Sequence, residues 1–314
     1  MKEYAPQYYR DFRCIADKCR HSCCVGWEID VDDVTYAKYK AVDGDFGRRL
    51  TTSIREEGNI RSFCLTETER CPFLNESGLC DVILNLGESY LSQICTDHPR
   101  FRNFFSDRTE IGLGLSCEEA ARLVLSQKEP MHLVVISDDG EEDETAAFDA
   151  ALLIVRDELL SFVAQKNLSL NERLQSVLTA VSAIIPQKSM AEWADVYMEL
   201  EMLDTSWGAL LGRLATVDDE AIALLGTRFD KELSQLLSYF IYRHTSAAID
   251  EIDLRGRVSF SVLGVLVVRA LCAVKMRDDG ACVFDDLAEF CRLYSSEIEY
   301  SEENVATLLD VLSE

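Results

Sequence analysis

Four thiols fall within eleven residues near the start of the chain, in the stretch CIADKCRHSCC from residue 14 to residue 24. Thiols this close together can form disulfides, ligate a metal, or supply a redox nucleophile with its resolving partners. Only Cys272, Cys282 and Cys291 lie beyond the first 117 residues. The other nine of the twelve cysteines are Cys14, Cys19, Cys23, Cys24, Cys64, Cys71, Cys80, Cys95 and Cys117.

The setting of these cysteines favours metal binding over disulfides. The opening MKEYAPQYYRDFRC has no basic start followed by an apolar run, so we expect no secretory signal and a cytoplasmic protein. In a reducing cytoplasm, a dense group of cysteines is more often a metal site than a set of disulfides. Their odd number also fits poorly with complete pairing.

The spacing of the cysteines narrows the kind of metal site. The order C-x4-C-x3-C-C lacks the paired C-x2-C hooks of a zinc ribbon. It also lacks the C-x3-C-x2-C loop of radical enzymes that use S-adenosylmethionine, because Gly26 stands at the third position. The adjacent thiols of Cys23 and Cys24 point in different directions along an extended backbone, which suits a multinuclear cluster or two neighbouring sites. We therefore expect an iron-sulfur cluster, with zinc as the alternative.

Cys117 has a separate argument for metal binding. Ser116 and Glu119 have the spacing of a capping box, and Pro130 follows the amphipathic stretch, so the pattern predicts a helix that begins here. Cys117 would then lie in the first helical turn, where free backbone amides and the helix dipole favour the thiolate. The alternative is a small apolar residue packed at a helix start.

The elements around the cysteines are predicted to be mainly helical. We expect a cysteine-rich, metal-binding part over residues 1–130 with little regular β structure, and a helical part over 145–314 packed against it. A second capping box, Ser169 with Glu172, opens one of these helices. Cys272, Cys282 and Cys291 have apolar neighbours and are predicted to be core thiols. Residues 131–137 predict a short strand, 138–144 an acidic loop, and the following ranges predict helices: 145–166, 169–185, 190–203, 218–249, 259–276 and 284–295.

Charge and hydropathy exclude two classes of partner. A formal net charge of −25 and a pI near 4.5 leave no basic excess for binding a phosphate backbone, so we expect no nucleic acid partner. The apolar stretch 258–274 is interrupted by Arg269 and is shorter than the roughly 20 residues of a membrane span, so it predicts a buried helix. The acidic surface serves solubility or attracts a cationic substrate.

The cysteine segments resemble a known family. The runs CIADKCRHSCCVGWEIDVD, CPFLNESGLCDVILNLGESYLSQICTDHPRF and LGLSCEEAARLVL, over residues 10–128, are similar to the flagellin lysine N-methylases and the cysteine-rich zinc- or iron-chelating domain they contain. Weaker similarity continues through LLSYFIYRHTSAAID and RVSFSVLGVLVVRAL. The cysteines that match are Cys14, Cys19, Cys23, Cys24, Cys71, Cys80, Cys95 and Cys117.

The resemblance implies methyl transfer from S-adenosylmethionine to lysine side chains of flagellin, on a protein with a cysteine-bound metal centre. Cys64 matches less clearly, and His98 stands where the family has an aromatic residue, which favours packing over metal ligation. His21 and Arg100 are further candidates beside the centre. The sequence has no strand-linked glycine-rich fingerprint of a nucleotide-binding fold, so the cofactor pocket cannot be located from it. The catalytic base is not located either.

Two functions follow from the sequence. The first is an enzyme that transfers the methyl group by polar substitution, with the metal structural or positioning. The second is a non-catalytic, metal-stabilised module that binds another protein. Trp27, Tyr36 and Tyr39 are expected to form the apolar cover of the cysteine group, with the lining of a cofactor pocket as the alternative.

Overall fold

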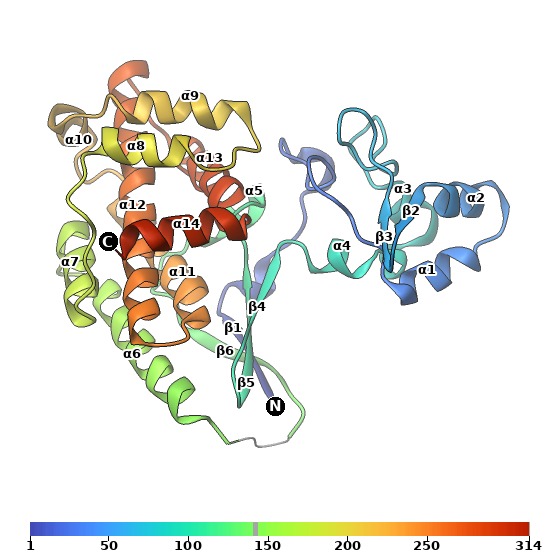
Figure 1. Cartoon of the computed structure of the whole chain (residues 1–314), viewed down its shortest axis with the longest axis horizontal. Helices are drawn as coiled ribbons and strands as arrows, with labels where there is room; N and C mark the ends of the chain where they lie inside the picture. Colours follow the sequence, from blue (N-terminus) through green and yellow to red (C-terminus); the bar gives the residue numbers. More distant parts are fainter. Residues whose placement is uncertain (141–143, 314) are drawn as a thin grey trace. The chain divides into compact units, whose positions relative to one another are not determined.

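A computed structural model describes residues 1–140 and 144–313 of the chain (Figure 1). The chain forms two compact units, one of Arg13–Phe101 and one of Met1–Phe12 with Arg102–Glu314. The predicted parts, 1–130 and 145–314, divide the chain elsewhere, since the first twelve residues belong with the C-terminal helices. The predicted acidic loop at 138–144 falls partly on residues 141–143, which lie outside the described residues.

The unit of Arg13–Phe101 is built from short elements around a small core. Its hairpin pairs Ile54 with Phe63 and Glu57 with Ile60. Gly58, at φ 63°, supplies the left-handed conformation that this tight turn needs. The elements are a turn of 3₁₀ helix at Ala16–Lys18, α1 at Asp33–Lys40, α2 at Gly44–Thr52, β2 at Ile54–Glu57, β3 at Ile60–Phe63, α3 at Asp81–Leu86, a 3₁₀ turn at Glu88–Tyr90 and α4 at Gln93–Asp97.

The second unit begins with a four-stranded sheet of order β4-β5-β1-β6. The strands are β1 at Lys2–Pro6, β4 at Arg100–Phe104, β5 at Arg108–Leu113 and β6 at Leu133–Asp138. The N-terminal strand β1 runs parallel to β5 and antiparallel to β6. The first part therefore contributes to two small sheets, which is more regular β structure than the sequence predicts. Polar residues interrupt the strands RFRNF and RTEIGL, which weakens the alternation that indicates a strand.

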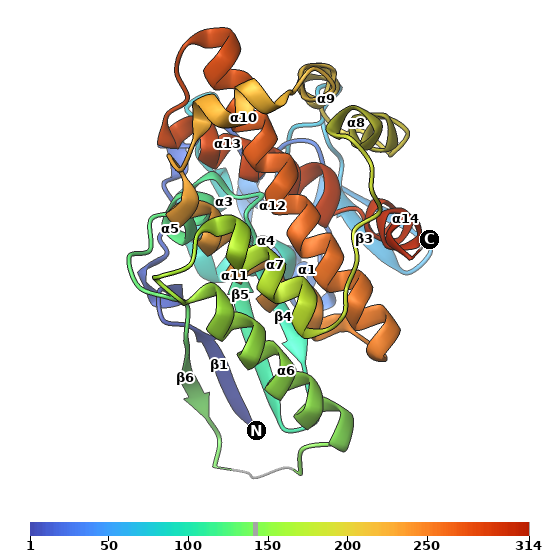
Figure 2. The same ribbon diagram turned by 90° about the vertical axis from the view of Figure 1, so that its left-hand side faces the viewer.

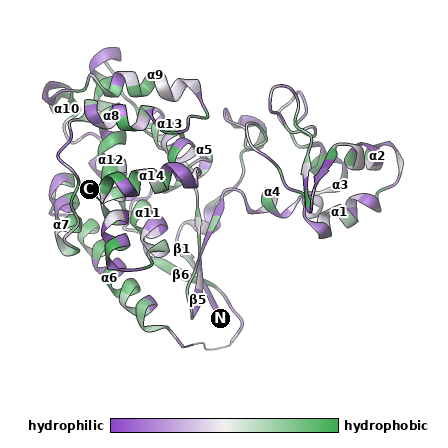
Figure 3. Cartoon of the chain, in the orientation of Figure 1, coloured by the Kyte–Doolittle hydropathy of each residue, from purple (hydrophilic) through white to green (hydrophobic). Residues whose placement is uncertain are grey.

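The predicted helical C-terminal part is confirmed, and 56% of the structure is helical. Hydrophobic residues run along α6, which lies beside the sheet strands in Figure 2 and is largely hydrophobic in Figure 3. The helices are α5 at Glu118–Leu125, α6 at Ala147–Val163, α7 at Leu170–Ala180, α8 at Met190–Met198, α9 at Thr205–Leu214, α10 at Asp219–Leu225, α11 at Asp230–His244, α12 at Glu251–Asp279, α13 at Phe284–Tyr294, a π-helical turn at Ser295–Glu299 and α14 at Glu302–Leu312.

The central helix of this unit is α12, which packs against α7, α9, α10, α11, α13 and α14. Its residues 258–274 are buried except for partly exposed Leu266 and Arg269, so the predicted buried helix is confirmed. In the described part of the chain, it is the one helix long and apolar enough to cross a membrane, and 83% of its most apolar window is buried inside the protein. It begins at Glu251 rather than Ser259, because Asp250 caps it by accepting from the Asp253 backbone N–H.

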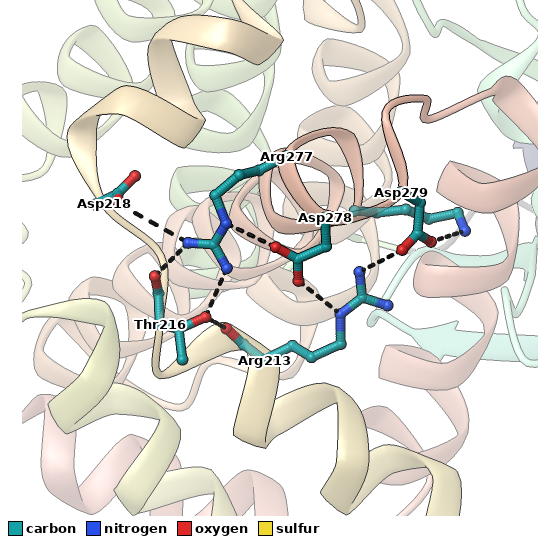
Figure 4. A network of polar contacts seen from close by, with 7 residues as sticks. Arg213, Thr216, Asp218, Arg277, Asp278 and Asp279 are labelled. Atoms are coloured by element: carbon teal, nitrogen blue, oxygen red, sulfur yellow. Dashed lines mark hydrogen bonds and ion pairs between the residues drawn. The ribbon is translucent and has the colours of Figure 1, made fainter.

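The C-terminal end of α12 is tied to the neighbouring helices by a polar network (Figure 4). Arg277 donates to the backbone and hydroxyl of Thr216, and it also contacts Asp278. Arg213 of α9 reaches both Asp278 and Asp279. These groups are partly exposed, so the network fixes the end of α12 more than it stabilises the fold.

Local helix signals in the sequence had different outcomes. The Ser169–Glu172 capping box is confirmed. The predicted helix 218–249 is wrong as a single element, because Gly226 adopts φ 58° and ends α10 before α11 begins. The strand predicted at 131–137 is present as β6.

Candidate functional site

Four cysteines gather around the core of the unit Arg13–Phe101. Cys71 is part of this core, beside Tyr39, Phe63 and Phe73. Three partly buried cysteines pack against the same core: Cys24, Cys80 and Cys95. We call Cys24, Cys71, Cys80 and Cys95 the thiol quartet. All twelve cysteines of the chain lie in the described part, and none is joined in a disulfide there.

Local backbone structure positions the thiol quartet. The Cys71 backbone N–H donates to the Cys24 carbonyl at 2.8 Å, which joins the two cysteine segments. Cys80 is the N-cap of α3, and its carbonyl accepts from the Leu84 N–H at 3.0 Å. Cys95 lies within α4. Three separate segments of the chain therefore bring their thiols to the same core.

The thiols of the quartet are electrostatically linked. The pKa of Cys71 is raised to about 12, mainly by burial, and negative charge on Cys24, Cys95 and Cys80 contributes in the same direction. Burial likewise raises the pKa of Cys95 to about 11, with Cys24 and Cys80 adding to it. A hydrogen bond from Cys23 lowers the pKa of Cys24 to about 7. Without a cation, one thiolate is therefore the most that this group holds comfortably near neutral pH.

The quartet has the donor chemistry of a metal centre. A bound cation reverses the local electrostatics and deprotonates its thiol ligands, so four mutually repelling thiolates are stable only around positive charge. Among the described residues, however, no three His, Cys, Asp or Glu side chains stand at coordinating spacing. The four thiols are suitable donors for a metal or cluster, but the described residues do not arrange them as a coordination sphere. Metal binding remains a prediction.

The other predicted ligands occupy different places. Cys14 and Cys23 are exposed, Cys19 is partly exposed, and the Cys19 thiol contacts the His21 carbonyl at 3.2 Å. The loop that carries them approaches the turn before Cys80, since a Cβ on Gly78 would lie 3.9 Å from Asp17 Cα. Cys64 is exposed, and its backbone N–H donates to the Ser53 carbonyl.

Cys117 belongs to the other unit, Met1–Phe12 with Arg102–Glu314. It is the N-cap of α5, which begins at Glu118, and its side chain makes no capping hydrogen bond. The predicted capping box of Ser116 and Glu119 is wrong: the Ser116 hydroxyl is buried without a partner among the described residues. The helix starts one residue later than the pattern predicts, so Cys117 precedes the first turn instead of lying in it.

The residues expected to cover the cysteines take three different roles. Tyr39 is buried in the core and donates to the Tyr90 carbonyl at 2.8 Å. The Trp27 ring lies 5.9 Å from the His98 ring, and burial lowers the pKa of His98 to about 4, as expected for a packed neutral imidazole. Tyr36 lies under the Arg61 guanidinium. Arg100 donates to the carbonyls of Thr96 and His98.

A hollow of about 560 Å³ lies in the same unit and is acidic. Its lining includes four aspartates and one arginine: Asp30, Asp32, Asp33, Asp97 and Arg61. Asp32 caps α1 and also accepts from the Gln93 backbone N–H, and Arg61 contacts Asp33. Asp32 and Asp33 therefore have structural partners, which leaves less of the negative charge in the hollow for a ligand.

The second unit holds a buried charged network that the sequence did not indicate. Glu299, in the π-helical turn, accepts from Tyr239 and contacts His244 at 2.7 Å and Arg243 at 3.4 Å. The neighbouring loop of Gly114 and Leu115 contacts this network, because the Leu115 backbone N–H donates to the Tyr239 hydroxyl. A π-helical turn often marks a functional site, but it becomes visible only in the structure. His244 alone had no metal-like spacing.

A cavity of about 390 Å³ lies between α6 and the sheet of this unit. It is lined by Tyr4 of β1, Arg108 of β5, the segment Met131–Leu133, and α6 residues that include Arg156 and Asp157. Arg156 is almost fully buried and forms two hydrogen bonds with buried Glu110, at 2.6 and 2.8 Å. This cavity joins apolar walls to a few fixed polar groups, as small-molecule sites do.

Three known proteins are similar to the chain. Lysine-N-methylases of Salmonella choleraesuis and Salmonella typhimurium are each 28% identical over 223 residues, which is 65% of this chain and 55% of those proteins. The flagellar biosynthetic protein FliU of Salmonella muenchen is 29% identical over 144 residues, 42% of this chain and 84% of that protein. The chain spans about half the length of the two methylases it matches. No family model matches the chain, and no solved structure does. Through these matches, the chain is distantly homologous to the lysine-N-methylases of Salmonella and to FliU.

Proposed function

We propose that the protein is an S-adenosylmethionine-dependent methyltransferase that modifies lysine side chains of flagellin in the cytoplasm. The similarity to lysine-N-methylases over 65% of the chain carries this proposal. The cysteine segments support it, because four of the eight cysteines that resemble the family pack at one core as the thiol quartet.

The proposed reaction is a polar substitution. The lysine ammonium first gives up a proton, because only the neutral amine has a lone pair for attack. The amine nitrogen then bonds to the methyl carbon of the sulfonium, and the carbon–sulfur bond breaks with its electron pair left on sulfur. The products are N-methyllysine, S-adenosylhomocysteine and the released proton. No oxidant or reductant is needed.

The thiol quartet is proposed to hold the metal centre, an iron-sulfur cluster or zinc, with the other matched cysteines as further candidate ligands. Bound metal would supply structural order to three loops that otherwise share only a small core. The acidic character of the chain suits a cationic target, since negative surfaces raise the local concentration of lysine side chains.

The proposal is tested by incubating metal-replete protein with its cognate flagellin and S-adenosylmethionine, with and without dithionite, followed by mass spectrometry of lysine peptides. We expect added mass of one or more methyl groups on lysine in both conditions. Methylation only with dithionite would overturn the polar reaction. No methylation, with flagellin captured by the protein instead, would favour a non-catalytic binding module.

A further inference from the structure

Ser92 lies next to the thiol quartet and has a hydroxyl that the fold does not use. It is the N-cap of α4 and is 1% exposed, and Cys95 follows it at the third helical position. The Ser92 hydroxyl is buried, makes no capping hydrogen bond, and has no partner among the described residues. A buried hydroxyl without a partner costs free energy, so its position beside a candidate metal ligand needs a physical reason.

Two other helices of the chain show what a serine in this position does. Ser169 and Ser189 are the N-caps of α7 and α8, and each has a glutamate at the third helical position. Their hydroxyls donate to the carboxylates of Glu172 and Glu192, at 2.7 and 2.8 Å. An N-cap serine in this chain can therefore donate its hydroxyl hydrogen to an anionic side chain three positions later.

The backbone of Ser92 has nearly the same conformation as these two caps. Its φ and ψ are −65° and 159°, against −65° and 163° for Ser169 and −65° and 162° for Ser189. The third helical position holds Cys95 in place of a glutamate. Burial raises the pKa of the Cys95 thiol and the Ser92 hydroxyl acts in the opposite direction, so the two side chains are neighbours. A neutral thiol accepts hydrogen bonds weakly, whereas a thiolate would be an anionic acceptor like the two carboxylates.

We propose that Ser92 is a positioning residue of the metal centre, whose hydroxyl donates a hydrogen bond to the Cys95 sulfur when that sulfur is a metal-bound thiolate. The inference rests on the proposed function, because it concerns the metal centre that the thiol quartet is proposed to hold. The bond gives the buried hydroxyl its acceptor and fixes the direction of the sulfur. It also stabilises the thiolate, in the way that partners outside the ligand set support a bound metal.

The hydrogen bond is tested with variants of the full chain. Each protein is purified anaerobically, and the rate at which its own metal passes to EDTA is measured. Ser92→Ala removes the hydroxyl, so we expect metal release to be about 10-fold faster than in the wild type. Ser92→Thr keeps a hydroxyl and should release metal at close to the wild-type rate. Ser89→Ala removes an exposed hydroxyl three positions earlier and should change nothing.

Ser92→Asp distinguishes this role from helix capping. Aspartate is as good an N-cap as serine, but its carboxylate has no hydrogen to donate and repels a neighbouring thiolate. A serine that only capped α4 would be replaced equally well by threonine and by aspartate. The proposed hydrogen bond predicts slow metal release in Ser92→Thr and fast release in Ser92→Asp.

The outcomes separate this inference from the functions on which it rests. Release at the wild-type rate in Ser92→Ala, or equal rates in Ser92→Thr and Ser92→Asp, would overturn the assigned hydrogen bond and leave the metal centre in place. A wild-type protein that holds no metal after anaerobic purification would overturn the metal centre together with this inference. Methyl transfer is decided by the flagellin experiment and does not depend on these rates.

Discussion

Arg156 of α6 and Glu110 of β5 form a two-fold hydrogen-bonded ion pair with almost no exposure to water, which joins the helix to the sheet across 46 residues of sequence. Removing one partner of a buried pair leaves the other charge uncompensated. We therefore predict that Glu110→Gln lowers the free energy of unfolding by about 3–5 kcal/mol in urea titrations. Glu28→Gln, which breaks the exposed pair with Arg55, is the control and should have little effect. Similar losses in the two variants would contradict a specific role for the buried pair.

Two glycines in helices of the same unit should respond to alanine with opposite signs. A Cβ on Gly264 of α12 would lie 2.9 Å from Phe240 Cε2 and 3.0 Å from the Tyr294 hydroxyl, and both rings are buried in the core. We predict that Gly264→Ala lowers the free energy of unfolding by about 1–3 kcal/mol through overpacking. Gly212 of α9 has open space at the same position, so Gly212→Ala should raise stability by about 0.5–1 kcal/mol. Thermal unfolding of the pair measures both effects, and stabilisation by Gly264→Ala would show that the core accommodates the methyl group.

Sequence patterns predicted the local features of this fold better than the distant ones. The capping box of Ser169 and Glu172 depends on residues three positions apart and was correct. The same spacing at Ser116 and Glu119 failed, since the Ser116 hydroxyl is buried without a partner among the described residues and the helix starts after Cys117. The break at Gly226 depends on a backbone conformation that hydrophobic periodicity does not report.

The candidate sites show the same difference between local features, which the sequence predicts, and distant contacts, which it does not. Cysteine density predicted a thiol group, but only the fold selects Cys24, Cys71, Cys80 and Cys95 from it. The Arg156 side of the cavity had no sequence signal at all, since an arginine in an amphipathic helix normally predicts a solvated face. Its burial becomes visible only with Glu110, which lies on a strand far away in the sequence.

Stability should fall as the pH falls below about 6.5, because burial lowers the pKa of two histidines, His98 and His244. Burial lowers the pKa of His244 below its ordinary 6.5. The unfolded chain then binds more protons than the folded one, so acidification favours unfolding in the window from 6.5 down to the folded pKa. The pKa of Glu299 is also lowered: burial would raise it, but the Arg243 guanidinium and the hydrogen bond with His244 outweigh burial. The stabilisation that ionised Glu299 gives to the fold is complete above its unfolded pKa of about 4.5 and is lost at lower pH.

The pH effect can be assigned with two histidine variants. His244→Gln removes the titrating ring, so the free energy of unfolding should depend less steeply on pH between 5 and 6.5. The reduction in slope corresponds to at most about one proton taken up on unfolding. His132→Gln changes an exposed imidazole in the same unit and should leave that slope as in the wild type. Urea titrations at several pH values measure the slope, and an unchanged slope in His244→Gln would refute the assignment.

The thiol quartet predicts how metal content responds to single cysteine changes. Cys71→Ser removes the one thiol of the quartet that is part of the buried core, so anaerobically purified protein should lose most of its iron and acid-labile sulfide. Cys272→Ser alters a thiol that is fully buried in α12, where the prediction of a core thiol is confirmed, and it should keep its metal while losing some packing stability. If the wild-type protein holds zinc at full occupancy and no acid-labile sulfide, the metal centre is zinc and not an iron-sulfur cluster. Equal metal content in the two variants would contradict the quartet as ligands.

Cys117→Ser separates two roles that this residue can have. Serine is a better N-cap than cysteine, because its hydroxyl can accept from the free backbone N–H groups of α5, which the thiol does not do here. Metal-free Cys117→Ser should therefore unfold with a free energy about 0.5–1 kcal/mol higher than metal-free wild type. If Cys117 is also a metal ligand, as its match to the family predicts, the same variant should hold less metal or lose its cluster faster in air. Elemental analysis and cluster absorbance, measured beside the metal-free unfolding curve, distinguish these effects. Higher stability with unchanged metal content would leave Cys117 as a helix cap and remove it from the ligand set.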